Sequence, residues 1–186
     1  YVKQLNYAQA IEEHRKVLAF DPRHMATYYD LSYIYFLRGE YGEVETLLTE
    51  GVRRDSTDAS FHRLLGRMRF KELAFDQAVV ALNRSVELDS TDAATFTDLA
   101  QVEMKRRDYA AAEQAARRAV GLDGFAKEAY FVLSNALKRL GRREESKQVL
   151  ERFRALDQQL DKIDDQLRML GNEPDDHEAR AQLGLL

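Results

Sequence analysis

The pentapeptide DSTDA occurs twice in this chain, at residues 55–59 and again at residues 89–93, which is 34 residues later. Repetition at a fixed period constrains a fold strongly, because each copy must form the same local structure. The step of 34 recurs without insertion through five units. We call a series of residues spaced 34 apart a ladder, and one ladder holds an aspartate every time: Asp21, Asp55, Asp89, Asp123 and Asp157. The chain is therefore predicted to be an array of repeated units.

Further ladders share this register and differ in the type of side chain. A leucine ladder comprises Leu31, Leu65, Leu99 and Leu133. A mostly aromatic ladder comprises Tyr28, His62, Phe96 and Tyr130. A ladder of small residues comprises Ser32, Gly66, Ala100 and Ser134, and another of small or modest residues comprises Ala10, Val44, Ala78, Ala112 and Ser146. Large and small side chains in fixed alternation predict that neighbouring helices cross closely at the small ones.

Each unit is predicted to form two helices. In the third unit, Phe61, Leu65 and Met68 lie at helical spacing, and a second apolar stripe follows over residues 78–86 after a break near Leu73. The composition agrees, because only 2 of the 186 residues are Pro and 9 are Gly, while 45% are hydrophobic. The fold class is therefore predicted to be all-α.

The DSTDA motif is best explained as the joint between two units. Ser90, Thr91 and Asp92 precede an apolar-periodic segment and can accept hydrogen bonds from the free N–H groups of the next helix. The carboxylate of Asp89 also favours the positive end of that helix. We therefore predict a helix-to-helix joint here rather than a ligand site.

A 34-residue helix–turn–helix unit with these ladders resembles the tetratricopeptide repeat family. The resemblance covers residues 1–157, as a partial repeat at residues 1–24 followed by repeats starting at residues 25, 59, 93 and 127. Tyr1 falls near the end of a first helix in this register, so a turn is expected before Tyr7. The resemblance implies a right-handed superhelical α-solenoid whose concave groove, lined by the first helix of each unit, holds a peptide or a partner protein.

Two departures from the family pattern lead to specific expectations. Arg69 and Glu103 occupy the same place in adjacent units, where the family favours tyrosine, and we expect them to form an ion pair. Some family members clamp the C-terminal carboxylate of heat-shock chaperones with a lysine and asparagines. Here Asn135 matches, but Phe131 stands in the lysine's place, so this clamp is not expected.

The positions that line the groove in the family are basic and aromatic here, although the whole chain carries a net charge of −4. They comprise Tyr29, Tyr33, Phe36, Arg63, Arg67, Phe70, Lys71, Gln101, Lys105, Phe131, Asn135 and Lys138. Such a wall suits a peptide with carboxylates and some apolar anchors. Two alternatives stay open: these are ordinary solvated charges and packed rings, or the groove holds a segment of this chain or a second copy.

After Asp157 the register fails, and apolar residues recur at steps of three and four from Phe153 to Leu170. We predict that the last repeat helix extends through residues 158–171, and that residues 172–186 begin a further truncated repeat or a capping helix. The apolar seam of this extension offers a self-association surface, or folds back on the solenoid. The proposed seam residues are Leu156, Leu160, Ile163 and Leu167.

Catalytic and metal motifs are not found in the sequence. It has no Cys, no HExxH, no GxSxG and no glycine-rich phosphate loop, so no catalytic residue, metal site or cofactor is assigned. Mild acidity argues against nucleic-acid binding, and no apolar run is long enough for membrane insertion. The first residue is Tyr1, so we expect a piece of a longer protein, one whose other domains could include an enzyme. The compartment stays open between cytoplasm and periplasm.

Overall fold

The computed structural model describes residues 2–172 of the chain, with the side chains of residues 6–159 and Lys162. Nine α-helices and no strand lie within this range. They are α1 (Val2–Phe20), α2 (Met25–Arg38), α3 (Tyr41–Arg54), α4 (Ala59–Lys71), α5 (Phe75–Leu88), α6 (Ala93–Arg106), α7 (Tyr109–Leu122), α8 (Lys127–Arg139) and α9 (Arg143–Asn172). The prediction of an all-α fold is confirmed.

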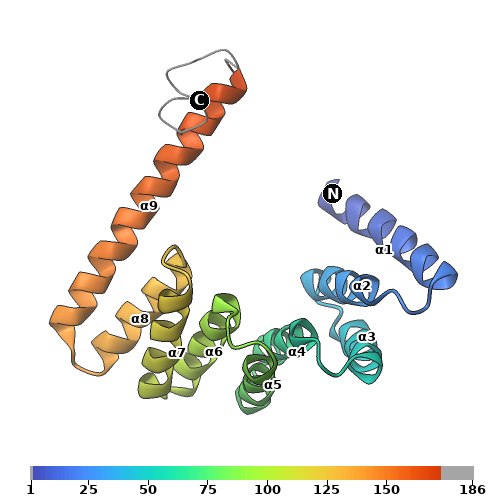
Figure 1. The fold of residues 1–186 in the computed structure, drawn as a ribbon, viewed down its shortest axis with the longest axis horizontal. Helices are drawn as coiled ribbons and strands as arrows, with labels where there is room; N and C mark the ends of the chain where they lie inside the picture. Colours follow the sequence, from blue (N-terminus) through green and yellow to red (C-terminus); the bar gives the residue numbers. More distant parts are fainter. Residues whose placement is uncertain (1, 173–186) are drawn as a thin grey trace.

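The helices pack in consecutive pairs, α2 with α3, α4 with α5, α6 with α7 and α8 with α9, and each pair contacts the next. The result is an open, curved solenoid with α1 at one end and α9 at the other (Figure 1). Its apolar core is distributed over the pairs. The largest cluster of buried side chains lies between α1 and α4, and two smaller clusters follow toward α9.

The joints between units are built by two aspartates with different partners. Asp89 accepts hydrogen bonds from the backbone N–H of Thr91 at 2.8 Å and from its hydroxyl at 2.7 Å, which closes the turn. Asp92 then caps α6 by accepting from the N–H groups of Ala94 and Thr95 at 3.0 and 3.2 Å. The first DSTDA copy repeats both features, so the predicted joint is confirmed.

Small residues mark the places where helices approach most closely, as predicted. A Cβ atom added to Gly66 would lie 2.5 Å from Leu82 Cγ, well inside van der Waals contact. At the equivalent position of the next unit, Ala100 is fully buried. In the unit after that, the Ser134 hydroxyl donates to the Ser146 backbone oxygen at 3.1 Å. The ladder of small residues therefore sets the distance between the paired helices.

The turn between the two helices of a unit has a left-handed residue that was not predicted from the sequence. Gly39, Leu73, Arg107 and Gly141 lie 34 residues apart and have φ values of 77°, 63°, 64° and 81°. Each follows a first helix and redirects the chain into the second. The two glycines of this set were the available signal, but a leucine and an arginine stand between them.

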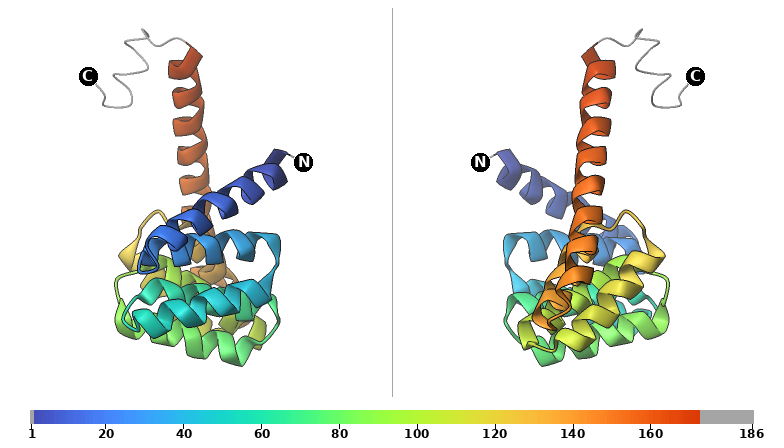
Figure 2. Two further views of the ribbon diagram at one scale, coloured as in Figure 1. Left: turned by 90° about the vertical axis from the view of Figure 1, so that its right-hand side faces the viewer. Right: turned by 90° about the vertical axis from the view of Figure 1, so that its left-hand side faces the viewer.

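The two ends of the array depart from the regular unit. α1 runs without a break from Val2 to Phe20, so the turn expected before Tyr7 is not formed. Residues 2–7 contain neither Gly nor Pro, and the helix simply propagates through them. At the other end α9 is a single helix of 30 residues, and its C-terminal half extends beyond the packed helices (Figure 2). The unit predicted at residues 172–186 lies, beyond Asn172, outside the described part.

The expected ion pair between Arg69 and Glu103 was wrong. Arg69 instead pairs with Glu45 of α3 and, at 2.9 Å, with Glu72 at the end of its own helix. Glu103 is 5% exposed and pairs with Arg106, one turn further along α6, at 2.8 Å. Arg69 therefore reaches Glu45 in the preceding unit instead of Glu103 in the following one, and Glu103 finds its partner within its own helix.

Candidate functional site: the wall of first helices

The first helices of the units, α2, α4, α6 and α8, carry the residues predicted to line a groove. The N-terminal part of this wall is packed against itself. The rings of Tyr29 and Tyr33 stack with their centroids 6.3 Å apart, and the Arg67 guanidinium lies over Tyr33 and Phe36 at 5.8 and 5.1 Å. Phe36 is only 6% exposed, and burial raises the pKa of the Tyr29 hydroxyl. These residues mainly hold α2 and α4 together.

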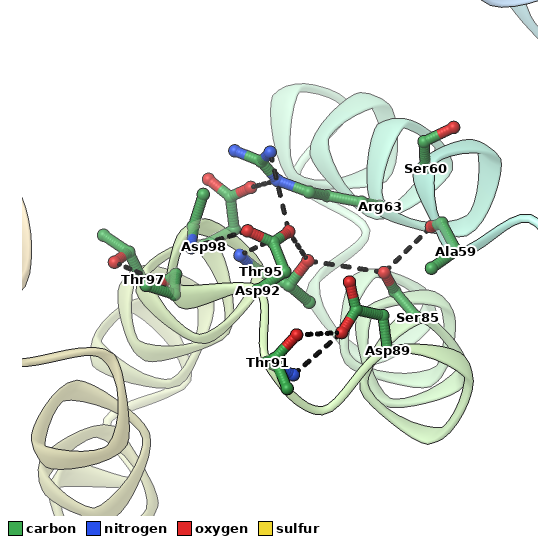
Figure 3. Close-up of polar contacts among 12 residues, drawn as sticks. Ala59, Ser60, Arg63, Ser85, Asp89, Thr91, Asp92, Thr95, Thr97 and Asp98 are labelled. Atoms are coloured by element: carbon green, nitrogen blue, oxygen red, sulfur yellow. Dashed lines mark hydrogen bonds and ion pairs between the residues drawn. The ribbon is translucent and has the colours of Figure 1, made fainter. Parts of the chain in front are cut away.

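The guanidinium of Arg63 also forms its contacts within the protein. Its guanidinium bonds to the Asp98 carboxylate of α6 at 2.7 Å and lies 3.7 Å from that of Asp92 (Figure 3). Burial raises the pKa of Asp98, although the Arg63 charge opposes that rise. Asp98 was not among the residues predicted from the sequence. Its signal was a spacing of 35 from Arg63, which places the two side chains next to each other on adjacent first helices.

The C-terminal part of the wall contains an open cavity of about 460 Å³. Its size falls in the range typical of ligand pockets, about 300–1,000 Å³. It is lined by Phe70, Gln101, Met104, Lys105, Lys127, Glu128, Phe131, Val132, Asn135 and Phe153. These residues come from α4, α6, α8 and the first part of α9, so four helices form one concave site. We call this cavity the Phe131 pocket.

The floor of the Phe131 pocket is apolar and incompletely covered. Phe131 remains 52% exposed although its ring contacts that of Phe153, with centroids 5.9 Å apart. Asn135 uses its amide to donate to the Phe131 backbone oxygen at 3.0 Å, so its side chain follows the helix. A smaller cavity of about 200 Å³ adjoins the pocket along α4 and α6, where Arg67, Phe70 and Gln101 contribute to its lining.

Exposed lysines lie where the first helices end, and one of them, Lys105, lines the cavity. Lys71, Lys105 and Lys138 lie in the last turns of α4, α6 and α8 and are exposed. Within the range that the structure describes, none of the three forms an ion pair with an acidic side chain. By contrast, Lys127 at the start of α8 is paired with Asp157 at 2.6 Å. The charge that remains free for a ligand therefore lies at the C-terminal ends of the helices.

Ten of the twelve predicted groove residues fall into two groups, while Lys71 and Lys138 lie exposed at the ends of α4 and α8. Five of them line the Phe131 pocket: Phe70, Gln101, Lys105, Phe131 and Asn135. Tyr29, Tyr33, Phe36, Arg63 and Arg67 make contacts inside the protein. The spacing of Phe153 predicted a place in the C-terminal seam. The structure instead places it in the lining of the pocket, where its ring, carried by α9, contacts Phe131 of α8.

The self-association seam is only partly described. Leu156 is 1% exposed, so it packs within the solenoid rather than on a free surface. The backbone of Leu160, Ile163 and Leu167 belongs to α9, while their side chains lie outside the described residues. Within the described range, no helix is both long and apolar enough to span a membrane.

Two family models match the sequence, over residues 1–68 and residues 97–162, and both describe the tetratricopeptide repeat. The chain belongs to the tetratricopeptide repeat family. The ladders identified in the sequence and the paired helices of the structure are the features that this family shares. A search of curated protein sequences found no match.

Solved structures with the same fold include proteins of different length and identity. The crystal structure of MamA has a TM-score of 0.75 at 22% identity, over 86% of this chain and 94% of that one. PilF of Pseudomonas aeruginosa has a TM-score of 0.75 at 16% identity, over 99% and 92%. The second repeat domain of Spaghetti (RPAP3), bound to the HSP90 peptide SRMEEVD, has a TM-score of 0.53 at 27% identity, over 53% and 92%.

Proposed function

We propose that this chain is a non-catalytic protein-interaction scaffold that holds a segment of a partner protein on the wall formed by α2, α4, α6 and α8. One observation carries the proposal, namely the open, apolar Phe131 pocket on that wall. A solenoid exposes a long surface built from repeated helices, and a partner can lie along it without a deep cleft. The peptide complex of the RPAP3 domain, a structure of similar fold, supports a peptide as the kind of ligand.

The proposed partner segment is acidic, as the sequence predicted, but different residues would receive it. Arg63 is neutralised by Asp98, and Arg67 lies against two rings, so neither cation is available without breaking an internal contact. The exposed Lys71 and Lys105 are better placed, because their charges have no acidic partner within the described residues. A bound carboxylate would therefore lie over the ends of α4 and α6.

The repeat division proposed from the sequence is retained. Units that start at residues 25, 59, 93 and 127 are supported by helices beginning at Met25, Ala59, Ala93 and Lys127. Residues 158–171 then extend the last helix of the array, within α9. Binding through the first helices of these units would leave α3, α5 and α7 on the opposite side of the partner.

The test is to select peptides from a random displayed library against the protein and to map their binding by backbone chemical-shift perturbation. The proposal expects saturable shifts on α2, α4, α6 and α8, with the strongest around Phe131. Scrambled versions of the selected peptides serve as controls. Shifts confined to α3, α5 and α7, or no selected peptide that binds, would contradict a groove on this wall.

Self-association through α9 is a second candidate, favoured by the extension of this helix beyond the packed array (Figure 1). A helix that leaves its neighbours behind buries its apolar seam only if another chain covers it. The candidate residues are Leu160, Ile163 and Leu167, since Leu156 is already buried. Light scattering of the protein and of its Leu160→Asp, Ile163→Asp variant decides this: a dimer that becomes a monomer supports the seam, and a monomeric parent protein rejects it.

A further inference from the structure

The Phe131 pocket has an apolar floor and differently charged ends, which restricts what can fill it. Phe70, Met104, Phe131 and Phe153 supply the apolar surface from α4, α6, α8 and α9. Phe131 keeps about half of its surface exposed in spite of its contact with Phe153. Large exposed rings at a concave surface are typical of sites that bind an apolar side chain of a partner.

The charges around the floor are separated across the width of the wall. Because the first helices of a solenoid run side by side in the same direction, their starts form one edge and their ends the other. Lys71, Lys105 and Lys138 mark the edge where α4, α6 and α8 end. Glu128 lies at the start of α8, where Lys127 is already paired with Asp157. One edge is therefore basic, and the other is neutral to acidic.

Helix stability explains only part of this arrangement. Cations at the C-terminal end of a helix interact favourably with its dipole, which accounts for lysines in the last turns of the helices. The dipole does not require that these lysines lack acidic partners. Some other basic residues near turns are paired, as Arg106 is with Asp76 and Arg142 with Glu145. The basic edge beside the pocket is thus left free to receive charge from outside.

We infer that the Phe131 pocket is the anchor subsite for one aromatic or large aliphatic side chain of a partner segment whose carboxylates lie over Lys71 and Lys105. This inference rests on the proposed function and makes it specific to one part of the wall. The apolar side chain displaces water from the floor, and the carboxylates meet the basic edge and avoid Glu128. The ligand class is an acidic peptide with a single large apolar anchor.

Methionine methyl groups provide a local probe of this site. Met104 lines the pocket, Met68 is fully buried in the core, and Met25 begins α2, far along the array. The protein is labelled with ¹³C in its methionine methyl groups and titrated with synthetic nine-residue peptides. One peptide has a central Phe among Asp, Glu and Ser; a second has Ser in place of Phe; and a third has Lys in place of every acid.

The acidic Phe peptide is expected to shift the Met104 methyl signal in a saturable way and to leave Met68 unchanged. Replacement of the central Phe by Ser should weaken binding at least tenfold, because the pocket floor is then left unfilled. Replacement of the acids by Lys should also weaken it at least tenfold. Equal affinity of the acidic and the basic peptide would overturn the inference.

Two protein variants test the direction of the charge separation. Lys105→Glu should weaken binding of the acidic Phe peptide about tenfold, whereas Glu128→Gln should leave it unchanged or tighten it up to about threefold. Lys147→Glu, which changes the net charge as Lys105→Glu does but lies outside the pocket, serves as the control and should have less than a twofold effect. Equal losses in the Lys105 and Lys147 variants would reduce the effect to long-range charge and overturn the inference.

Further outcomes separate this inference from the proposed function. If library-selected peptides shift α2 and α4 but never Met104, the scaffold function stands and the anchor subsite is wrong. If no peptide shifts any of the first helices, both are wrong. A Met104 signal that depends on protein concentration without peptide indicates a second copy in the pocket. A Met104 signal that moves, without peptide, when residues 173–186 are deleted indicates that this segment of the chain fills the pocket instead. Either result overturns the inference.

Discussion

At the scale of single residues, two glycines of the same helix have opposite structural roles. Gly51 of α3 is buried, and a Cβ atom there would lie 2.2 Å from Cε1 of the fully buried Phe61 ring. Gly42 of α3 has no heavy atom within 4 Å of the equivalent point. The helix tolerates both glycines, yet only Gly51 is required by its surroundings.

This contrast predicts that Gly51→Ala and Gly42→Ala change stability in opposite directions. Alanine favours a helix over glycine by about 1 kcal/mol, so Gly42→Ala should stabilise by about 0.5–1 kcal/mol. At Gly51 the overpacking against Phe61 costs about 1–3 kcal/mol and should exceed that gain. Urea unfolding followed by circular dichroism measures both variants, and a stabilised Gly51→Ala variant would show that the close approach is not rigid.

Leu73 carries a backbone conformation that suits glycine better. Its φ of 63° lies in the left-handed region, where an L side chain costs about 1–2 kcal/mol. The side chain is 73% exposed, so it contributes little packing. We therefore expect Leu73→Gly to be about 1 kcal/mol more stable than Leu73→Ala, which keeps the Cβ atom. The same midpoint for both variants in thermal unfolding would contradict the predicted strain.

At the scale of elements, a group of charges fastens α7 to the start of α9. Glu113 of α7 accepts from Arg117 at 2.7 Å and from Arg142, in the turn before α9, at 2.6 Å. Arg117 and Arg142 both also reach Glu145 of α9, at 3.1 and 2.6 Å. The segment GRREE, residues 141–145, therefore connects two units, and its opposite charges stabilise that connection through ion pairs.

These contacts make stability depend on pH in a defined direction. Hydrogen bonds from Arg117 hold the pKa of Glu113 below its usual range, and those from Arg142 do the same for Glu145. A carboxyl whose folded-state pKa is lowered stabilises the fold above its unfolded pKa of about 4.3, and that contribution is lost as the pH falls through the folded-state value. Stability should therefore decline below about pH 4.5.

Glu113→Gln tests this dependence directly. The variant should lose up to about 1 kcal/mol of unfolding free energy at pH 7, the range measured for partly exposed ion pairs. The difference from the parent protein should shrink as the pH falls below the unfolded pKa of about 4.3 and should disappear once the pH lies below the lowered folded-state pKa of Glu113. Glu144→Gln, which affects one exposed pair with Lys147 within α9, is the matched control. A difference that stays constant between pH 7 and pH 3 would exclude a contribution from the charge of Glu113.

At the scale of the whole molecule, stability is distributed unevenly along the array. Each unit contacts only its neighbours, so the terminal helices have one neighbour and the central ones have two. Among its described side chains, α1 contributes one, Ile11, to the buried hydrophobic core, and α9 continues past the packed helices. The ends of the solenoid should therefore open more readily than its middle.

Hydrogen exchange followed by mass spectrometry should show this gradient. We expect the amides of α1 and of the α9 extension to exchange at least tenfold faster than those of α4, α5 and α6, because a local opening at an end exposes little apolar surface. Helical amides of α7 serve as an internal reference within the packed array. Uniform protection from α1 to α9 would indicate a single cooperative unit instead.

Much of the fold was accessible from the sequence, because it repeats. The 34-residue ladders predicted helix pairs, the aspartate joints and the close crossing at Gly66 correctly. Repetition makes such features local: each depends on residues of one unit and its neighbour. The unbroken α1 escaped prediction because the repeat register implied a turn where residues 2–7 carry neither glycine nor proline. The left-handed Leu73 escaped because no glycine marks its turn.

The site depended on the tertiary structure, because the partners of charged and aromatic side chains follow from distances between units. Periodicity placed Arg63 and Arg67 on the wall. Only the packing of α4 against α6 and α2 showed that Arg63 pairs with Asp98 and that Arg67 lies over two aromatic rings. Phe153 has the spacing of a seam residue, yet the crossing of α9 over α8 turns it into the pocket. The sequence by itself determined the repeated architecture, and three-dimensional contacts decided which part of the wall stays open.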